Sequence, residues 1–261
     1  MKRADITVPL GLLIGLATIG GAAMIEGIRP GFLWQPTAAM VVFGGTVGAI
    51  IIRRGVSGLA ASLRAAAGLL YHDNAEESDA TLARLVWLAR LSKREGVKAL
   101  ETHAASQPDP MMVQALTLIS QYADPALVRM QLGRILEYED ERGLRDVATL
   151  EAAGGFAPTF GILGAVLGLI QVLRALAEPN ALGAGIATAF VATIYGVGAA
   201  NLLLFPLAAR LRERHDRMIQ RRSALLDALV ALAAHEGPGV IAQRYSSGSG
   251  YAEKRGVIRV A

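Results

Sequence analysis

The chain has 261 residues, of which 53% are hydrophobic and 18% charged, and its mean hydropathy is +0.41. Soluble domains carry about 25% charged residues, so this composition favours a membrane protein. The absence of cysteine excludes a disulfide scaffold and thiolate metal sites. The net charge of +4 would permit a nucleic-acid partner, but the basic residues cluster where membrane topology would place them.

Four stretches are apolar over about the 20 residues that a helix needs to cross a bilayer. They cover residues 6–25, 34–52, 154–176 and 182–206. A cleaved signal peptide is the alternative for residues 1–25, because Lys2 and Arg3 precede the apolar run. That run is long for a signal peptide, however, and the second stretch follows almost at once. We therefore predict four transmembrane helices.

The basic residues predict the orientation. Arg53 and Arg54 follow the second span, and six arginines between residues 210 and 222 follow the fourth, whereas the segments 26–33 and 177–181 carry only Arg29 as a base. Both termini and the segment 53–152 are therefore expected in the cytoplasm of an inner-membrane protein. The predicted fold class is an all-α membrane protein with four transmembrane helices and a helical cytoplasmic domain inserted between helices 2 and 3. The predicted domains are 1–53 (helices 1 and 2), 54–152 (cytoplasmic), 153–207 (helices 3 and 4) and 208–261 (a basic helix and a flexible tail).

The cytoplasmic segment is expected to be helical throughout. Its spacing predicts a helix from about Ser78 towards Pro108, a second over 111–121, and a long charged third helix that starts at Asp124-Pro125. Residues 207–236 are expected to extend the fourth span as a basic helix, and the Ser/Gly-rich residues 245–252 to form a flexible end.

A charged stripe lies in this segment. Arg90, Arg94 and Lys98 follow at intervals of four, with Lys93 and Glu101 close by, and on one helix they would share a side. The pattern fits a solvated surface, which is the commoner case, or an electrostatic docking surface for a partner.

Spans three and four carry small residues at intervals that let membrane helices approach closely. Those we expect to pack the helices are Gly161, Gly164, Gly168, Ala192, Gly196 and Ala200. Pro158 is expected at the start of span three and Pro206 at the end of span four, as a helix break or as a hinge.

The four stretches contain no acidic residue, and Thr159 and Thr193 are among the few polar groups. A threonine in a span commonly bonds its own helix backbone. A protein that moves protons or cations usually needs an ionisable group in the membrane. If this chain conducts ions, a partner must supply that group.

Four motifs resemble the MotA/PomA family. Two lie in spans three and four, as residues 157–170 (APTFGILGAVLGLI) and 189–201 (AFVATIYGVGAAN); the others are residues 43–49 (FGGTVGA) and 96–101 (GVKALE). Their order and spacing agree with the family up to about residue 215. The resemblance implies a flagellar motor stator subunit that forms a homo-oligomeric ring, expected to be a pentamer, around a MotB/PomB-type protein. The partner's aspartate would bind the coupling ion, and the ring would drive the rotor through a FliG-type protein.

The resemblance also implies roles for individual residues. Lys93 stands where the family commonly has arginine on its rotor-facing surface, and Glu101 keeps an acidic position there. This raises the docking interpretation of the stripe formed by Arg90, Lys93, Arg94, Lys98 and Glu101. Pro158 and Pro206 match two functional prolines that would couple ion flow to torque.

The expected ion pathway contains Pro158, Thr159, Ala165 and Thr193. Thr193 matches the threonine near the family's ion path, whereas sodium-driven members usually have threonine where this chain has Ala165. Because alanine offers no side-chain oxygen to sodium, we expect proton coupling, with a sodium-driven stator as the alternative. We expect neither a bound cofactor nor a metal ion.

Three other classes of protein are weaker alternatives. An ExbB/TolQ-type energiser would have three spans and an external N-terminus, unlike the paired N-terminal spans predicted here. A solute transporter would need broken helices and a polar midplane. An enzyme is not expected, because the four histidines are scattered and no nucleophile–base spacing or phosphate loop appears.

Overall fold

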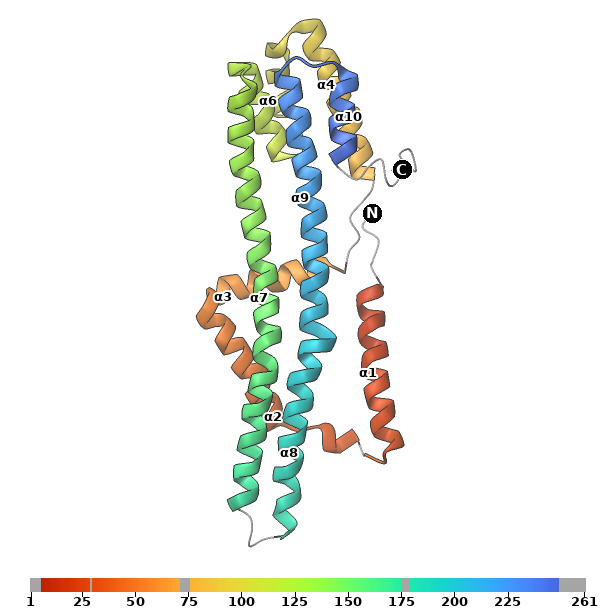
Figure 1. Cartoon of the computed structure of the whole chain (residues 1–261), viewed down its shortest axis with the longest axis vertical. Helices are drawn as coiled ribbons and strands as arrows, with labels where there is room; N and C mark the ends of the chain where they lie inside the picture. Colours follow the sequence, from red (N-terminus) through yellow and green to blue (C-terminus); the bar gives the residue numbers. More distant parts are fainter. Residues whose placement is uncertain (1–5, 29, 71–75, 175–178, 249–261) are drawn as a thin grey trace. The chain divides into compact units, whose positions relative to one another are not determined.

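The computed structural model describes residues 6–28, 30–70, 76–174 and 179–248 (Figure 1). Every regular element within these ranges is helical, as predicted. The elements are α1 (Thr7–Ile25), η1 (Pro30–Leu33), α2 (Pro36–Ala39), η2 (Met40–Gly44), α3 (Gly45–Gly68), α4 (Glu76–Glu95), η3 (Val97–Leu100), α5 (Glu101–Ala104), α6 (Pro110–Tyr122), α7 (Pro125–Arg174), α8 (Pro179–Gly198), η4 (Ala199–Leu204), α9 (Phe205–Ala233) and α10 (Pro238–Gly248).

Four helical stretches are long and apolar enough to cross a membrane, which confirms the predicted number. They are Thr7–Ile25, Gly31–Gly68, Pro125–Arg174 and Leu182–Ala233. The expected end of the third span at Leu176 lies outside the described residues. None of the residues of α1 is buried, so this helix presents apolar side chains all round. A helix of that kind is stable only where lipid or other apolar helices surround it.

The chain forms two compact units. Unit 1 comprises Met1–His72 and Leu144–Arg212, and unit 2 comprises Asp73–Gly143 and Glu213–Ala261. The long helix α7 and the run from α8 to α9 each contribute residues to both units. Two unit boundaries, at residues 143/144 and 212/213, fall inside these helices, 9 and 5 residues from the expected domain boundaries at 152/153 and 207/208. The third, at 72/73, lies 19 residues after the expected boundary at 53/54.

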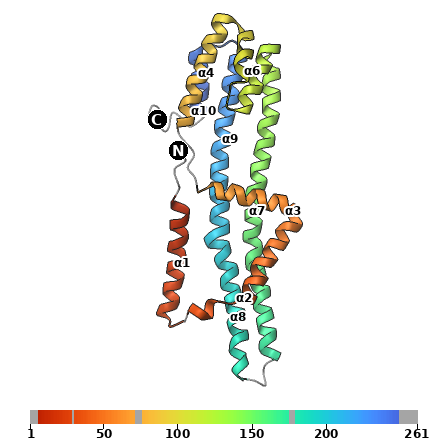
Figure 2. The same cartoon turned by 180° about the vertical axis from the view of Figure 1, so that it is seen from behind.

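A sharp bend at Gly55 shapes unit 1. This residue has φ +70° and ψ 170°, a backbone conformation that glycine alone adopts cheaply, so α3 divides into two legs. The second leg crosses α7 and α9 (Figure 2), and the Leu69 side chain after it packs against Leu150 and Leu211. Ser62 Oγ donates a hydrogen bond to Asp146 Oδ1 over 3.1 Å, and Arg54 pairs with the same carboxylate at 3.5 Å. These bonds fix the end of the first leg and the second leg on α7.

Unit 2 has an ordinary hydrophobic core. The second half of α9 supplies much of it through Leu229, Leu232 and their neighbours, which pack against buried side chains of α4, α6, α7 and α10. Figure 1 shows α4 and α10 side by side in this unit. Asp109 caps α6 by accepting a 2.9 Å hydrogen bond from the Met111 amide, and Asp124 caps the expected start of α7 in the same way. This core stabilises the unit by burying large aliphatic side chains.

Several sequence-based expectations were wrong in detail. Pro158 does not start a helix, because α7 begins 33 residues earlier at Pro125 and continues to Arg174. Pro206 does not end one either, since it lies at the second position of α9. The helix expected to reach Pro108 ends at Glu95, because Gly96 has φ +82°. Residues 245–248 belong to α10 rather than to a flexible end, and the Tyr245 side chain is buried; residues 249–252 lie outside the described residues.

Candidate functional site

Glycines let α7 and α8 approach closely in unit 1. A Cβ atom added to Gly161 would lie 2.9 Å from the carbonyl oxygen of Ala192, and one on Gly196 would lie 2.5 Å from that of Ala157. A Cβ on Gly168 would lie 2.7 Å from the Ala189 amide nitrogen. Contacts this short are possible only without a side chain, so the backbones themselves form the contact.

Of the other residues expected to pack these helices, Gly164 and Ala192 lie in the same contact, and Ala200 lies in η4 after α8. Ala192 and Ala200 are fully buried, and a Cβ atom on Gly164 would meet the Cβ of Ala192 at 2.7 Å. We call this contact, formed by Gly161, Gly164, Gly168, Ala192 and Gly196, the glycine seam. It holds α7 and α8 as one hairpin.

The seam brings together two of the four residues expected along the ion pathway. A Cβ on Gly196 would lie 3.1 Å from Pro158 Cα, and one on Gly161 would lie 3.5 Å from Thr193 Cα. Thr193 and Thr159 are exposed, and each hydroxyl donates to its own helix, at 3.4 Å to Ala189 O and 2.7 Å to Phe156 O. Ala165 is half-buried two turns after Pro158 and on the same face of α7.

The exposed side of this hairpin is almost wholly apolar. Leu163, Val166, Leu167 and Ile170 are among its exposed side chains, and no carboxylate lies between residues 152 and 177 or between residues 179 and 212. Among the described residues, no three His, Asp or Glu side chains are placed to hold a metal ion. The hairpin therefore offers a close-packed surface with a few hydroxyls, and an ionisable group there must come from another chain.

Two π-helical segments flank this region, and the sequence analysis did not predict them. They are η2 in the second span and η4 directly before α9. In a regular helix the Pro206 ring would clash with the carbonyl of Leu202, which lies in η4. The wider π turn accommodates the proline, so the helix continues past it. Single π turns are frequent at functional sites, and a proline within a span was the available signal.

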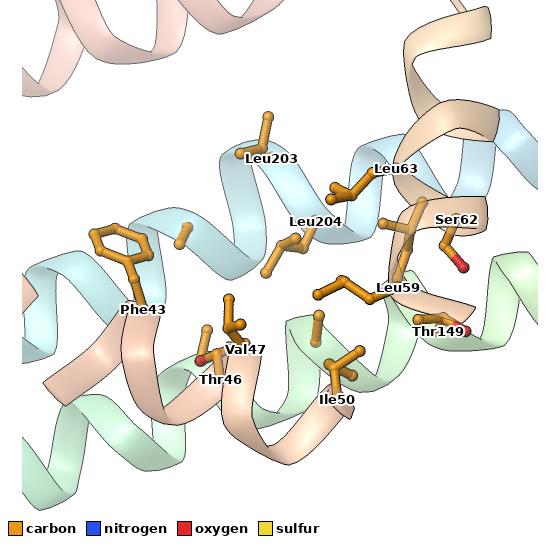
Figure 3. A pocket seen from close by; sticks show the side chains of 14 residues that line it. Phe43, Thr46, Val47, Ile50, Leu59, Ser62, Leu63, Thr149, Leu203 and Leu204 are labelled. Atoms are coloured by element: carbon orange, nitrogen blue, oxygen red, sulfur yellow. The ribbon is translucent and has the colours of Figure 1, made fainter. Parts of the chain in front are cut away.

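An apolar pocket lies between the two π segments and the bend of α3 (Figure 3). Its volume is about 190 Å³, and the side chains around it include Phe43, Val47, Leu59 and Leu204. Three hydroxyls line it, those of Thr46, Ser62 and Thr149, and each donates to a carbonyl oxygen of its own helix. Cavities of about 150 Å³ with such linings stay dry and take up small apolar molecules. The pocket belongs to the apolar interior of unit 1.

Tyr195 fixes the segment before the second span to α8. Its hydroxyl donates to the carbonyl oxygen of Leu33 and accepts a 3.4 Å hydrogen bond from the Gln35 amide. Thr188 Oγ1 lies 3.3 Å from Gln35 Oε1. The sequence analysis did not single out Tyr195, although a tyrosine inside an apolar span usually has a hydrogen-bond partner.

In unit 2, the predicted charged stripe is divided between three elements. Arg90, Lys93 and Arg94 lie on α4, Lys98 on η3 and Glu101 at the start of α5. The left-handed turn at Gly96 separates them, so they do not form one row along one helix as expected. All five side chains are exposed, and within the described ranges none has an ion pair or hydrogen bond.

Other charged groups of unit 2 are paired, and the sequence analysis missed them. Arg222 bonds both Asp109 Oδ1 at 2.9 Å and Glu139 Oε2 at 3.0 Å. The buried His215 ring lies 2.7 Å from Asp140 Oδ1, opposite Gly143, where a Cβ would overlap the imidazole. These partners are 75 to 113 residues apart in the sequence, so helical spacing could not reveal them.

Comparison with known proteins agrees with this geometry. The family model described as the MotA/TolQ/ExbB proton channel family matches residues 103–224. Chemotaxis protein PomA of Vibrio alginolyticus is 27% identical over 91% of this chain and 92% of its own, and motility protein A of Bacillus subtilis is 25% identical over 92% and 89%. The flagellar MotAB stator complex of B. subtilis contains a chain with a TM-score of 0.78, 25% identity, and coverage of 91% of this chain and 93% of that one. The span motifs, the helical hairpin and these matches together show that the chain is similar to the MotA/PomA proteins.

Proposed function

We propose that this chain is the MotA-type subunit of a flagellar motor stator, which converts ion flow into torque on the rotor. The observation that carries the proposal is a rigid membrane hairpin, closed by the glycine seam, that has no carboxylate of its own. Such a surface suits the wall of an ion pathway whose titratable group belongs to a partner. The solved stator complex that this chain resembles is described as MotAB, which supports a MotB-type partner.

The proposed assembly is a pentameric ring around the partner's membrane helices. The partner's aspartate takes up the coupling ion, and the driving force is about 2.3 kcal/mol per charge for each 100 mV across the membrane. Ion flow turns the ring, and a FliG-type rotor protein takes up the torque. In this role the chain acts without catalytic chemistry or a cofactor.

In the proposed arrangement the subunit lies in the inner membrane. Both termini and unit 2 face the cytoplasm. Arg53 and Arg54 after the second span and the arginines of α9 support it, because basic residues concentrate on the cytoplasmic side. Residues 73–143 then form a cytoplasmic insertion between the second and third spans. The C-terminal part of the chain packs against this insertion and shares its hydrophobic core.

Proton coupling is the proposed mode. Ala165 adds no oxygen ligand beside the seam, and the Thr193 hydroxyl is engaged by its own helix. Sodium binding needs several oxygen ligands, whereas a proton needs one titratable group, which the partner provides. Swimming that follows the sodium gradient rather than the proton gradient would contradict this choice.

Motility of a strain without its own copy of the gene tests the function. Wild type should restore swimming, whereas Pro158→Leu and Lys93→Glu should not, although each reaches the membrane at the normal level. Pro110→Ala is the matched control, because this proline occupies the first turn of α6, where its missing N–H costs nothing. Undiminished swimming of the deletion strain, with no second stator present, would refute the proposal.

A further inference from the structure

Trp87 is an exposed aromatic residue in the middle of a cationic face of α4. Its side chain is 47% exposed. Arg84, Arg90 and Arg94 lie three residues before it and three and seven residues after it, so all four share one side of the helix. Tryptophan and arginine are the residues most enriched among the strongest contributors to protein interfaces.

The indole ring is held in place rather than free. It meets the His103 ring edge to face, with centroids 4.9 Å apart and an angle of 87° between the planes. Ser106 Oγ and Gln107 Nε2 each donate a 2.9 Å hydrogen bond to the carbonyl oxygen of His103, which fixes the turn after the short helix α5. A fixed ring loses little entropy when it binds, so Trp87 is suited to act as an anchor.

A shallow hollow adjoins the ring. It has a volume of about 440 Å³, and Ala80, Arg84, Trp87, His103, Ser106 and Gln107 line it. Gln107 Oε1 is buried there and has no hydrogen-bond partner within the described ranges. The hollow is thus a recess beside the indole, with the Arg84 side chain in its wall.

The surrounding charge selects an acidic neighbour. Arg84, Arg90 and Arg94 flank Trp87 on its side of α4, and Lys93 and Lys98 add positive charge close by in the sequence, against the acidic Glu95 and Glu101. None of these five basic residues has an ion pair in the described part of the chain, whereas elsewhere in unit 2 Arg129 pairs with Asp227 and Arg244 with Glu236. The three arginines beside the indole therefore have no described carboxylate that neutralises them.

We propose that Trp87 is the apolar anchor by which this face docks an acidic protein surface that carries a recess for the indole. This assignment rests on the proposed function: in a stator subunit, the acidic surface that meets the Trp87 face belongs to the rotor protein. The basic residues around the indole steer the encounter, and Trp87 supplies the short-range binding energy. The two contributions differ in salt dependence, because screening weakens the charges and leaves the indole contact largely unchanged.

Binding of the purified stator complex to the purified FliG-type rotor protein tests the inference. The wild type is compared with Trp87→Ala, Trp87→Phe and Lys93→Glu over a range of salt concentrations. Tyr138→Ala is the matched control, because Tyr138 is a 61% exposed aromatic residue of the same unit on another helix. Circular dichroism and size-exclusion chromatography of each complex establish that it is folded and assembled.

Trp87→Ala should weaken binding by at least about 10-fold without changing its salt dependence, as expected for the loss of an aromatic anchor. Trp87→Phe should restore part of the affinity, Lys93→Glu should reduce the salt dependence, and Tyr138→Ala should bind as wild type. Trp87→Ala with wild-type affinity, beside a weakened Lys93→Glu, would overturn the anchor and leave the proposed function intact. A wild-type complex that fails to bind the rotor protein would also overturn it, and complementation of motility then decides the proposed function separately.

Discussion

The two units of this protein achieve close packing by opposite means. In unit 2, large aliphatic side chains such as Leu229 and Leu232 fill a core from which water is excluded. In unit 1, the closest contact between helices is made where side chains are absent, at Gly161, Gly168 and Gly196. The difference follows from the surroundings. Lipid is as apolar as leucine, so burying leucine in a membrane gains little, and close backbone contact stabilises the helices instead.

The polar groups differ in the same way. The threonines of the spans give their hydroxyl protons to carbonyl groups of their own helices, as Thr46 and Thr188 do at 2.7 and 2.9 Å. In unit 2, Arg222 joins carboxylates from two other segments of the chain. Polar groups in unit 2 therefore connect segments that are distant in the sequence, whereas those of the spans mostly satisfy themselves locally.

The largest expected effect lies in the core of unit 2. Leu229→Ala should cost about 2–5 kcal/mol of unfolding free energy, because the side chain is fully buried and leaves a cavity. Leu13→Ala in α1 removes the same atoms from an exposed site and should cost less than about 0.5 kcal/mol. Thermal unfolding of both variants in detergent measures the contrast. Equal losses would mean that α1 is packed as tightly as the core.

The glycine seam should respond to the smallest possible addition. Gly196→Ala places a methyl group 2.5 Å from the Ala157 carbonyl oxygen and should cost up to about 3 kcal/mol by overpacking, with loss of swimming. Gly198→Ala, on the same helix with no atom within 4 Å, should be neutral or slightly stabilising. Unfolding and motility of the two variants are compared directly. A harmless Gly196→Ala would refute the backbone contact.

The bend of α3 gives a smaller effect. Gly55→Ala should cost about 1–3 kcal/mol through backbone strain alone, because φ is +70° and no atom lies within 4 Å of the added methyl group. Gly48→Ala, in the helical first leg, is the control and should be neutral or stabilising. Thermal unfolding distinguishes the two, and identical melting temperatures would show that the bend is not required.

The smallest expected effect concerns an exposed ion pair. Arg217→Ala removes a 2.6 Å contact with Glu213 on one side of α9 and should cost less than about 0.5 kcal/mol. Arg222→Ala, which leaves two partly buried carboxylates without their partner, should cost about 1–3 kcal/mol. Chemical denaturation measures the free energy of unfolding of both variants, and so compares an exposed ion pair with a partly buried one. A costly Arg217→Ala would contradict the expected difference.

The spans could be predicted from the sequence because apolar length alone defines them, and the four predicted stretches were confirmed. Helix ends were harder. Pro158 was expected at the start of a span, as a break or a hinge, yet α7 continues through that position although the proline has no N–H to donate. Gly96 was available as a signal for the end of α4, but the regular spacing of Arg90, Arg94 and Lys98 suggested a longer helix.

The core of unit 2 was not predicted, because the arginines at the start of α9 made the whole segment look like a basic extension. The apolar residues from 224 to 233 follow them and pack against segments about 100 residues earlier. The pairs Arg222–Asp109 and His215–Asp140 depend on the same tertiary contacts. The π segment η2 has no simple residue pattern, whereas Pro206 was a signal for η4. The roles of Thr193, Ala165, Lys93 and Glu101 remain predictions from family resemblance.

The most direct test of the account is the rotation of a bead on a single motor in the deletion strain while expression is induced. The account predicts that speed rises in steps when this chain is produced together with its MotB-type partner. It also predicts no rise with this chain alone or with a partner whose membrane aspartate is changed to asparagine. Steps of torque without a partner carboxylate would contradict the claim that this chain provides the wall, and not the titratable group, of the ion pathway.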